Sequence, residues 1–210
     1  QVSSSAHLVL PHYKQLEEIR ELGRGAQGST KAGIADTYAA KAQRSGVRVE
    51  RVLVSHESHL QVVRSGLESV QMERKKHDLP SVDIENEVKR YAAAIQKLQP
   101  FVTDTSVYVN ERLRAGATLL AEGAQAFLLD IDHGMYPYVT SSSTTAGGVA
   151  TGLGIAPVTL DRSIGIVKAV QSHVGGGPFV TELQDKKLLD VLHGDMSTID
   201  AEKGTTAGRV

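Results

Sequence analysis

Apolar residues recur at helical spacing through much of the first half of the chain. From residue 56 to residue 99 they fall at i, i+3, i+4 and i+7, with an interruption at Asp78-Leu79-Pro80. This pattern predicts two amphipathic helices, which we interpret as a helical subdomain (56–99) within one larger domain (1–210). Shorter helices are predicted at residues 11–22, ended by Gly23, and at residues 37–44.

Beyond Pro100, short apolar runs alternate with helical patterns. Residues 119–124 and 164–174 are apolar enough for buried strands, and residues 6–11 also have a strand pattern. Helices are predicted at residues 104–113, with Asp104 as the N-cap, and at residues 144–153 and 185–192. This alternation favours an α/β fold with a largely parallel central sheet and flanking helices, in which ligands gather at the strand ends.

Composition narrows the functional classes. The 210 residues include 23 basic and 24 acidic side chains, so there is no basic excess for binding a nucleic-acid backbone. The chain has no cysteine, which excludes disulfides and thiolate metal sites and fits a reducing compartment. No apolar run approaches the roughly 20 residues of a membrane helix. We therefore expect a cytoplasmic protein that binds neither nucleic acid nor membrane.

The densest cluster of candidate ligand-binding residues lies between Gln125 and Gly148. Six consecutive hydroxyl residues, Thr140 to Thr145, lead into Ala146-Gly147-Gly148 and a predicted helix. Hydroxyl groups and glycine-exposed N–H groups ahead of a helix form a donor surface that suits a phosphate or a nucleotide carbonyl better than a cation. The amide of Gln125 can donate to a base oxygen, or it can satisfy loop backbone instead.

Other candidates have ordinary structural explanations beside the functional one. The hydroxyl of Thr30 suits phosphate, although loop threonines are usually turn residues. Arg44, at the end of a predicted helix, can bind phosphate oxygens through its guanidinium, or its side chain can simply face solvent. Leu129 and Val174 are typical of an apolar core.

Several titratable clusters are weaker signals. The spacing of His56 and His59 could bind a metal, but without a third ligand a solvated helix face is favoured. Asp130, Asp132 and His133 resemble a metal or acid–base cluster. The charged residues 73–76 are most simply an exposed helix end.

Four separated blocks of sequence together resemble the central part of adenylosuccinate synthetases, the GTP-dependent ligases that join IMP to L-aspartate. The first block is Gly28-Ser29-Thr30-Lys31 with residues 41–49, and the second is the stretch from EGAQ to ATG at residues 122–152. The third comprises residues 165–169, 174–179 and 181–183, and the fourth is Gly204-Thr205-Thr206-Ala207-Gly208-Arg209. The resemblance covers most of the chain and implies a fold like that of P-loop NTPases.

The resemblance also implies roles for individual residues. Gln125 would contact the purine at its reacting 6-oxygen, Thr30 and Thr140 would hold the 5′-phosphate of IMP, and Leu129 and Val174 would pack near its base and ribose. In a homodimer, Arg44 would reach the partner's IMP site. The loop that closes on L-aspartate would include Thr205, Thr206, Gly208 and Arg209.

The same resemblance implies that the segment with Asp130, Asp132 and His133 is structural support near the nucleotide, and it places GTP and Mg²⁺ mostly outside this chain. The family's phosphate-binding loop and catalytic residues precede the part that matches Gln1, and no G-x-x-x-x-G-K-[ST] motif occurs here. We therefore expect a central segment without catalytic residues, inactive alone. Two alternatives are a non-catalytic nucleotide-binding or dimerisation module of the same fold, and another phosphate-handling α/β enzyme. Departures from the family pattern occur at Ala35, Asp36, Ser143, His173 and Ala207.

Overall fold

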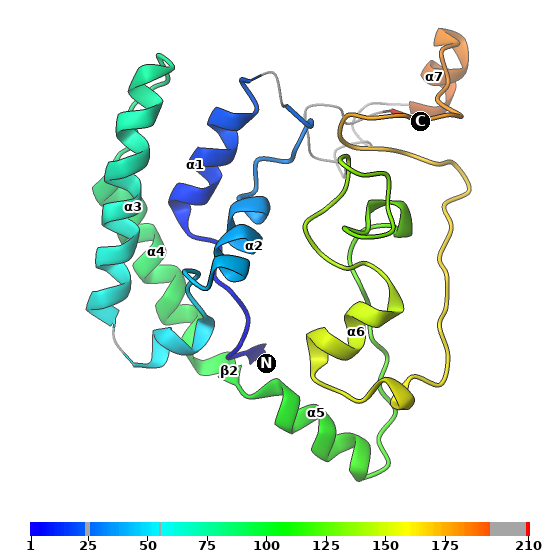
Figure 1. The fold of residues 1–210 in the computed structure, drawn as a ribbon, viewed down its shortest axis with the longest axis horizontal. Helices are drawn as coiled ribbons and strands as arrows, with labels where there is room; N and C mark the ends of the chain where they lie inside the picture. Colours follow the sequence, from blue (N-terminus) through cyan, green and yellow to red (C-terminus); the bar gives the residue numbers. More distant parts are fainter. Residues whose placement is uncertain (24–25, 55, 194–208) are drawn as a thin grey trace.

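The structure is a computed structural model that describes residues 1–23, 26–54, 56–193 and 209–210. Four helices form its first part, and Figure 1 shows them on the left: α1 (Pro11–Arg20), α2 (Ile34–Gln43), α3 (His56–Lys76) and α4 (Ile84–Leu98). Helix α5 (Thr105–Arg114) leads to a loop-rich second part with α6 (Ala146–Leu153) and α7 (Lys186–His193). Four 3-10 helices complete the order: η1 (Val49–Leu53), η2 (Gln99–Phe101), η3 (Phe127–Leu129) and η4 (Pro157–Thr159).

The helices predicted from periodicity are present, with boundaries shifted by a few residues. The predicted N-cap Asp104 accepts a hydrogen bond from the backbone N–H of Val107 at 3.0 Å, and Asp83 caps α4 in the same way. Helix α2 begins three residues earlier than expected, after Gly33. The interpretation of residues 56–99 as a subdomain stays a prediction.

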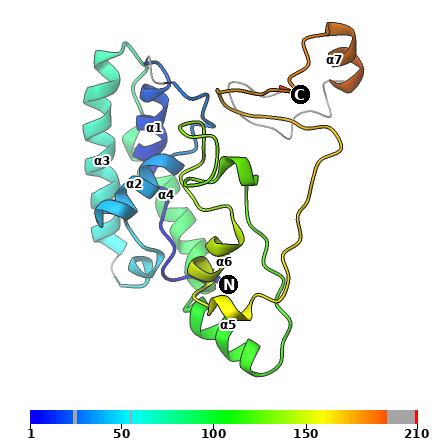
Figure 2. The same ribbon diagram turned by 45° about the vertical axis from the view of Figure 1, so that its right-hand side comes forward.

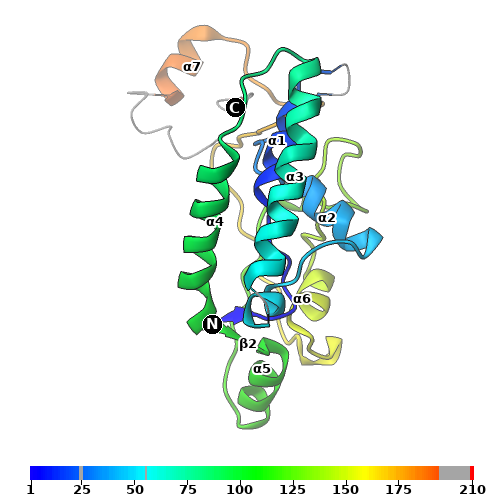
Figure 3. The ribbon, with the colours of Figure 1, turned by 90° about the vertical axis from the view of Figure 1, so that its left-hand side faces the viewer.

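Helices α3 and α4 lie side by side, as Figure 3 shows, and contribute most of the main core. This core consists of buried apolar side chains from α3, α4, η1 and the segment before α1: Leu10, Val52, Val63, Leu67, Val88, Tyr91 and Ile95. Because Leu10 and Val52 come from outside the α3–α4 pair, the pair shares its core with the rest of the first part. Burial of this set excludes water from the centre of the helical layer.

The inner face of α3 contains two polar residues that sequence reasoning placed in solvent. His59 and Arg74 are both buried, in line with Val63, Leu67 and Val70 at spacings of three or four residues. The prediction of a solvated His59 is therefore wrong, because its helical phase points it inward. Arg74 is likewise not part of an exposed helix end.

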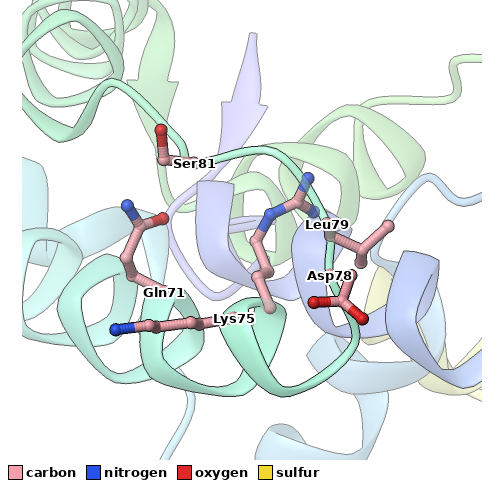
Figure 4. Close-up of a pocket in the computed structure, with 6 residues that line it drawn as sticks. Gln71, Lys75, Asp78, Leu79 and Ser81 are labelled. Carbon is pink, nitrogen blue, oxygen red and sulfur yellow. The ribbon is translucent and has the colours of Figure 1, made fainter.

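Arg74 instead holds the turn between α3 and α4. Its Nε donates to the carbonyl of Pro80 at 2.9 Å, and its Nη1 contacts Gln15 and Glu18 of α1. A cavity of about 300 Å³ lies at this turn, lined by Gln71, Arg74, Lys75, Asp78, Leu79 and Ser81 (Figure 4). Its lining includes none of the residues that the family resemblance assigns to ligand binding. Because its Gln71 and Arg74 bind the backbone of the turn, we interpret the cavity as structural.

The sheet among the described residues has two short parallel strands, β1 (Val2–Ser3) and β2 (Val102–Thr103). Val2 pairs with Val102 and Ser3 with Thr103. The strand expected at residues 6–11 is reduced to a single antiparallel bridge between His7 and Arg48. Pro11 begins α1 directly afterwards, which leaves little length for a strand.

The strands expected at residues 119–124 and 164–174 are not found in this structure. Neither segment forms a strand, and Figure 1 shows the chain after η4 as a long extended trace towards α7. Their apolar side chains are exposed: Leu120 by 84% and Ile166 by 90%. A strand requires a run of hydrogen-bonded neighbours, and in these two segments the pairing among the described residues is limited to one antiparallel bridge, between His173 and Arg209.

Among the helices that the structure describes, none combines the length and apolar character needed to cross a membrane. The longest of them, α3, carries charged residues along its length.

Candidate nucleotide-binding site

Gln125 occupies an unusual backbone conformation at the start of the candidate site. Its φ is +64°, in the left-handed region that residues other than glycine seldom adopt. The residue is exposed, and 3-10 helix η3 begins two positions later. Strained conformations of this kind persist where the surrounding structure fixes them, and they concentrate at functional sites.

The segment after Gln125 pairs with the hydroxyl tract, residues 140–145. The N–H of Thr140 donates to the carbonyl of Leu129 at 2.8 Å, and the N–H of Ile131 donates to the carbonyl of Ser142 at 3.2 Å. The hydroxyl of Thr144 donates to the carbonyl of Ala126 at 3.0 Å. The structure therefore brings together Leu129 and Thr140, and it fixes the tract beside the residue that follows Gln125.

The buried carboxylate of Asp130 links the two paired segments. Its side chain is fully buried, and Oδ1 accepts hydrogen bonds from the N–H groups of Asp132 and His133, both at 3.0 Å. Oδ2 accepts from the N–H of Thr144 at 2.7 Å. Burial alone would raise the pKa of Asp130, but these N–H groups and the side chain of Ser143 outweigh it and lower the pKa to about 2. The carboxylate is thus a fixed negative charge that ties two loop segments together.

A glycine-rich loop at residues 175–177 meets two other predicted site segments. The N–H of Gly176 donates to the carbonyl of Gln27 at 2.6 Å, and a Cβ on Gly28 would lie 3.0 Å from that same nitrogen. A Cβ on Gly177 would lie 2.5 Å from the ring of Tyr138. Glycine is required at these close approaches. Figure 2 shows the meeting of the three loops between the two parts of the molecule.

Thr30 and Val174 lie at the edges of this meeting point. Thr30 is exposed two residues after Gly28, while Val174 is half-buried directly before Gly175. Glu21 supports the Thr30 loop, because its carboxylate accepts hydrogen bonds from the N–H groups of Gln27 and Gly28. The loops that carry Thr30, Thr140 and Val174 are therefore neighbours, although they are far apart in sequence.

Arg44 lies at the C-terminal end of α2. Its φ of +64° closes the helix, and the N–H groups of Ser45 and Gly46 both bind the carbonyl of Ala40 at 3.0 Å. The Arg44 side chain is exposed. This placement leaves its guanidinium on the surface.

Arg209 has a dense set of contacts with the segment after Val174. Its guanidinium binds both carboxylate oxygens of Glu182, at 2.7 and 2.8 Å, and the carbonyls of Gly175 and Gly177. The other predicted residues of the aspartate loop, Thr205, Thr206 and Gly208, lie outside the described residues, as does the departure Ala207. Only the Arg209 end of that loop can be placed.

The described departures from the family pattern have local partners. Asp36 is buried and forms an ion pair with Arg20 of α1, while Ala35 is half-buried in the first turn of α2. Ser143 contacts the hydroxyl of Thr145 at 3.2 Å. The ring nitrogen Nε2 of His173 lies 3.0 Å from the carbonyl oxygen of Gly176.

Comparison with known proteins identifies the family of the chain. The sequence profile of the family described as adenylosuccinate synthetase matches residues 1–210. The chain belongs to this family.

Individual relatives show how much of the family the chain represents. It is 40% identical over 210 residues to adenylosuccinate synthetase from Frankia casuarinae, covering 99% of the chain and 48% of the relative. It is 41% identical over 211 residues to adenylosuccinate synthetase 1 from Laccaria bicolor, covering 99% of the chain and 47% of the relative. The chain thus spans about half the length of the curated relatives it matches.

A solved structure supports the predicted fold class. The chain resembles the structure titled as fully ligated adenylosuccinate synthetase from Plasmodium falciparum, with a TM-score of 0.79 and 34% identity. The match covers 99% of this chain and 48% of that one. The adenylosuccinate synthetase fold is thereby confirmed, even though the described residues contain only a small part of the expected sheet.

Sequence reasoning indicated Asp130 but missed two other residues that shape the candidate site. Asp130 binds backbone N–H groups through its carboxylate oxygens, as expected for structural support, and no three-residue metal cluster occurs in the part of the chain that the structure describes. Tyr138 packs on Gly177, and Glu182 binds Arg209. No local sequence pattern indicates the contacts of Tyr138 and Glu182.

Proposed function

We propose that this chain forms the IMP- and aspartate-binding part of a GTP-dependent ligase that joins IMP to L-aspartate. The products are adenylosuccinate, GDP and phosphate, in the synthesis of AMP. The observation that carries the proposal is the meeting of the loops bearing Thr30, Thr140 and Val174, through the contacts Gly176–Gln27 and Gly177–Tyr138. Membership of the family and the similarity to its solved structure support the same assignment.

The chemistry proceeds in two steps. The γ-phosphoryl group of GTP is transferred to the purine 6-oxygen, because an amide-like oxygen is a poor leaving group until it is phosphorylated. The amine of aspartate then attacks C6, the carbon that bears this oxygen. The C6–O bond breaks, and phosphate leaves with the oxygen. In this proposal Gln125 contacts the 6-oxygen, while positioning and charge neutralisation supply most of the rate.

The binding roles follow the placement of the residues. Thr30 and Thr140 hold the 5′-phosphate through neutral hydroxyl donors, which bind without a counter-charge that would trap the product. Leu129, held next to Thr140 by the backbone pairing, and Val174 pack on the base and ribose. Thr205, Thr206, Gly208 and Arg209 act on the aspartate side. We infer that GTP and Mg²⁺ are bound mainly by the part of the family's length that this chain does not span, and that the enzyme is cytoplasmic.

We also infer that the enzyme is a homodimer in which Arg44 completes the partner's IMP site. The exposed position of Arg44 at the end of α2 supports this role, because an exposed guanidinium is accessible to a second protomer. A single protomer would then have an incomplete phosphate pocket. Isologous dimers with shared sites allow a decisive complementation test.

The complementation test combines two inactive variants of the complete protein that contains this chain. Arg44→Ala and Gln125→Ala each lower activity alone. After mixing and subunit exchange, about half of the dimers are hybrids with one complete site, so roughly a quarter of wild-type activity returns. If Arg44 served its own protomer's site, mixing would restore nothing. Circular dichroism of each variant checks that the fold is intact.

The overall activity is tested by incubating the complete protein with IMP, GTP, Mg²⁺ and aspartate and following adenylosuccinate by its absorbance. Product that requires all four components is the expected result. A non-catalytic nucleotide-binding or dimerisation module would bind IMP in calorimetry and form no product. That outcome would overturn the ligase assignment and leave the binding site in place.

A further inference from the structure

The side chain of Arg209 is held by a carboxylate of the same chain. Its Nε donates to Oε1 of Glu182 at 2.7 Å, and its Nη2 donates to Oε2 at 2.8 Å. This is the two-point geometry in which a guanidinium binds a carboxylate most specifically. The hydrogen bonds also lower the pKa of Glu182 and raise the pKa of Arg209, so both groups stay charged. The Nε–Nη2 edge of the Arg209 guanidinium is therefore already occupied.

The Nη1–Nη2 edge of the guanidinium binds backbone carbonyl groups. Nη1 donates to the carbonyl of Gly175 at 2.9 Å and Nη2 to the carbonyl of Gly177 at 3.1 Å. The guanidinium also lies 5.7 Å from the centre of the Phe179 ring. An arginine has five N–H donors, and four of them are engaged here. In this arrangement Arg209 cannot bind a second carboxylate through two hydrogen bonds.

The backbone around Arg209 is fixed independently of its side chain. The N–H of His173 donates to the carbonyl of Arg209 at 3.0 Å, and the N–H of Leu183 donates to the carbonyl of Val210 at 2.7 Å. Loss of the Glu182 contact would therefore leave Arg209 beside the loop that carries Val174. The carbonyl contacts to Gly175 and Gly177 would also remain.

We propose that Glu182 is a positioning residue for Arg209, and that the substrate carboxylate takes its place on the guanidinium. In the absence of aspartate, Glu182 holds the guanidinium of Arg209 next to the IMP-binding loop. When the amino acid binds, its carboxylate replaces that of Glu182 on the Nε–Nη2 edge, and Glu182 turns to solvent. The inference rests on the proposed function, because it takes Arg209 as the group that binds aspartate.

The exchange makes Glu182 a competitor of the substrate. Both partners are partly exposed, with side-chain accessibilities of 20% for Arg209 and 27% for Glu182, so the exchange requires no unfolding. An uncharged side chain of the same shape would compete less well for the guanidinium. A purely structural tie would behave differently, because its loss would lower stability and would not improve aspartate binding.

The test is Glu182→Gln in the complete protein, with rates measured against aspartate at saturating IMP and GTP. We expect KM for aspartate to fall by roughly threefold to tenfold, the size of one part-exposed ion pair, with kcat within about twofold. The affinity for IMP alone should not change. Glu85→Gln is the matched control, because it removes the two-point pair between Arg64 and Glu85 on the helices and should leave KM unchanged.

A second variant and a binding measurement keep the outcomes distinct. Glu182→Asp keeps the charge but shortens the reach, and it should lower KM for aspartate by less. An unchanged or raised KM in folded Glu182→Gln protein would overturn the proposal, as would failure of both variants to fold. If wild-type protein forms no adenylosuccinate, the proposed function fails. Calorimetry of aspartate binding with IMP present then still tests whether aspartate replaces Glu182 on Arg209. Aspartate should bind more tightly to the Glu182→Gln variant than to wild type.

Discussion

Residues 10–101 bury apolar side chains against one another, whereas residues 116–183 leave most of theirs exposed. The seven buried residues of the main core all come from the first of these regions. Among the described residues beyond residue 101, Ile155 is the one buried apolar side chain. The second region is instead connected by polar contacts, with Asp130 and Arg209 at their centres.

The difference shows that the two regions depend on different kinds of interaction. The helical region depends on close packing, so the shape and volume of its side chains determine its stability. The loop region depends on hydrogen bonds to charged groups, which hold the backbone of the candidate site in position. A substitution should therefore affect mainly stability in the first region and mainly ligand binding in the second.

The largest effect is expected in the helical region, from Leu67→Ala. Leu67 is fully buried in α3, and its truncation should lower the free energy of unfolding by about 2–5 kcal/mol. Val62→Ala on the same helix is the matched control, because Val62 is 46% exposed and its change should cost less than about 0.5 kcal/mol. Urea unfolding of the complete protein measures both. Equal losses would mean that the packing contrast between the two faces of α3 is wrong.

An intermediate effect, on ligand binding, is expected from Asp130→Asn in the loop region. An amide keeps the shape but places an NH₂ group against backbone N–H donors, so the hydroxyl tract should lose its fixed position. We expect the Kd for IMP to rise by roughly tenfold, the cost of about one charge-assisted hydrogen bond. Calorimetry with IMP checks this, and Asp161→Asn, on an exposed residue, is the control. Unchanged IMP affinity would break the proposed link between Asp130 and binding.

The pH dependence of stability tests the same carboxylate. The folded-state pKa of Asp130, about 2, lies below the ordinary value for an aspartate. Its contribution to stability is therefore complete above the unfolded-state pKa of about 4 and is lost as the pH falls towards 2. Thermal melts of wild type and Asp130→Asn should differ near neutral pH and converge across this window.

The smallest effect is expected from Tyr91→Phe in α4. Among the described residues, the buried hydroxyl of Tyr91 has no hydrogen-bond partner, and burial raises the pKa of Tyr91 to about 12. Removing an unsatisfied hydroxyl should raise the free energy of unfolding by up to about 1 kcal/mol. Urea unfolding again gives the value. A clear loss of stability would show that the hydroxyl contributes to the helical region through a polar contact.

Sequence patterns predicted the helical region well because the pattern and the structure share one cause. Leu67 and Val88 face inward since helical periodicity places them with other apolar residues on one side. The same rule should have placed His59 inward, but its polarity suggested solvent. Chemical type was a poorer guide than position along the helix.

The loop region was harder to predict because its structure depends on contacts between distant segments. Leu120 and Ile166 have strand-like neighbours in sequence, but a strand also needs a pairing partner, which a local pattern does not contain. The residues of the candidate site were located through their resemblance to a family, not through periodicity. Contacts such as Glu182 with Arg209 became visible only in three dimensions.

The parallel pairing of residue 2 with residue 102 has a consequence for the order of folding. These strands close a loop that contains the whole helical layer, so they can meet only after the chain between them has become compact. The amide of Ser4, which donates to the carbonyl of Thr103 at 2.8 Å, therefore reports on that event. Its protection from hydrogen exchange would mark the moment at which the first half of the chain is assembled.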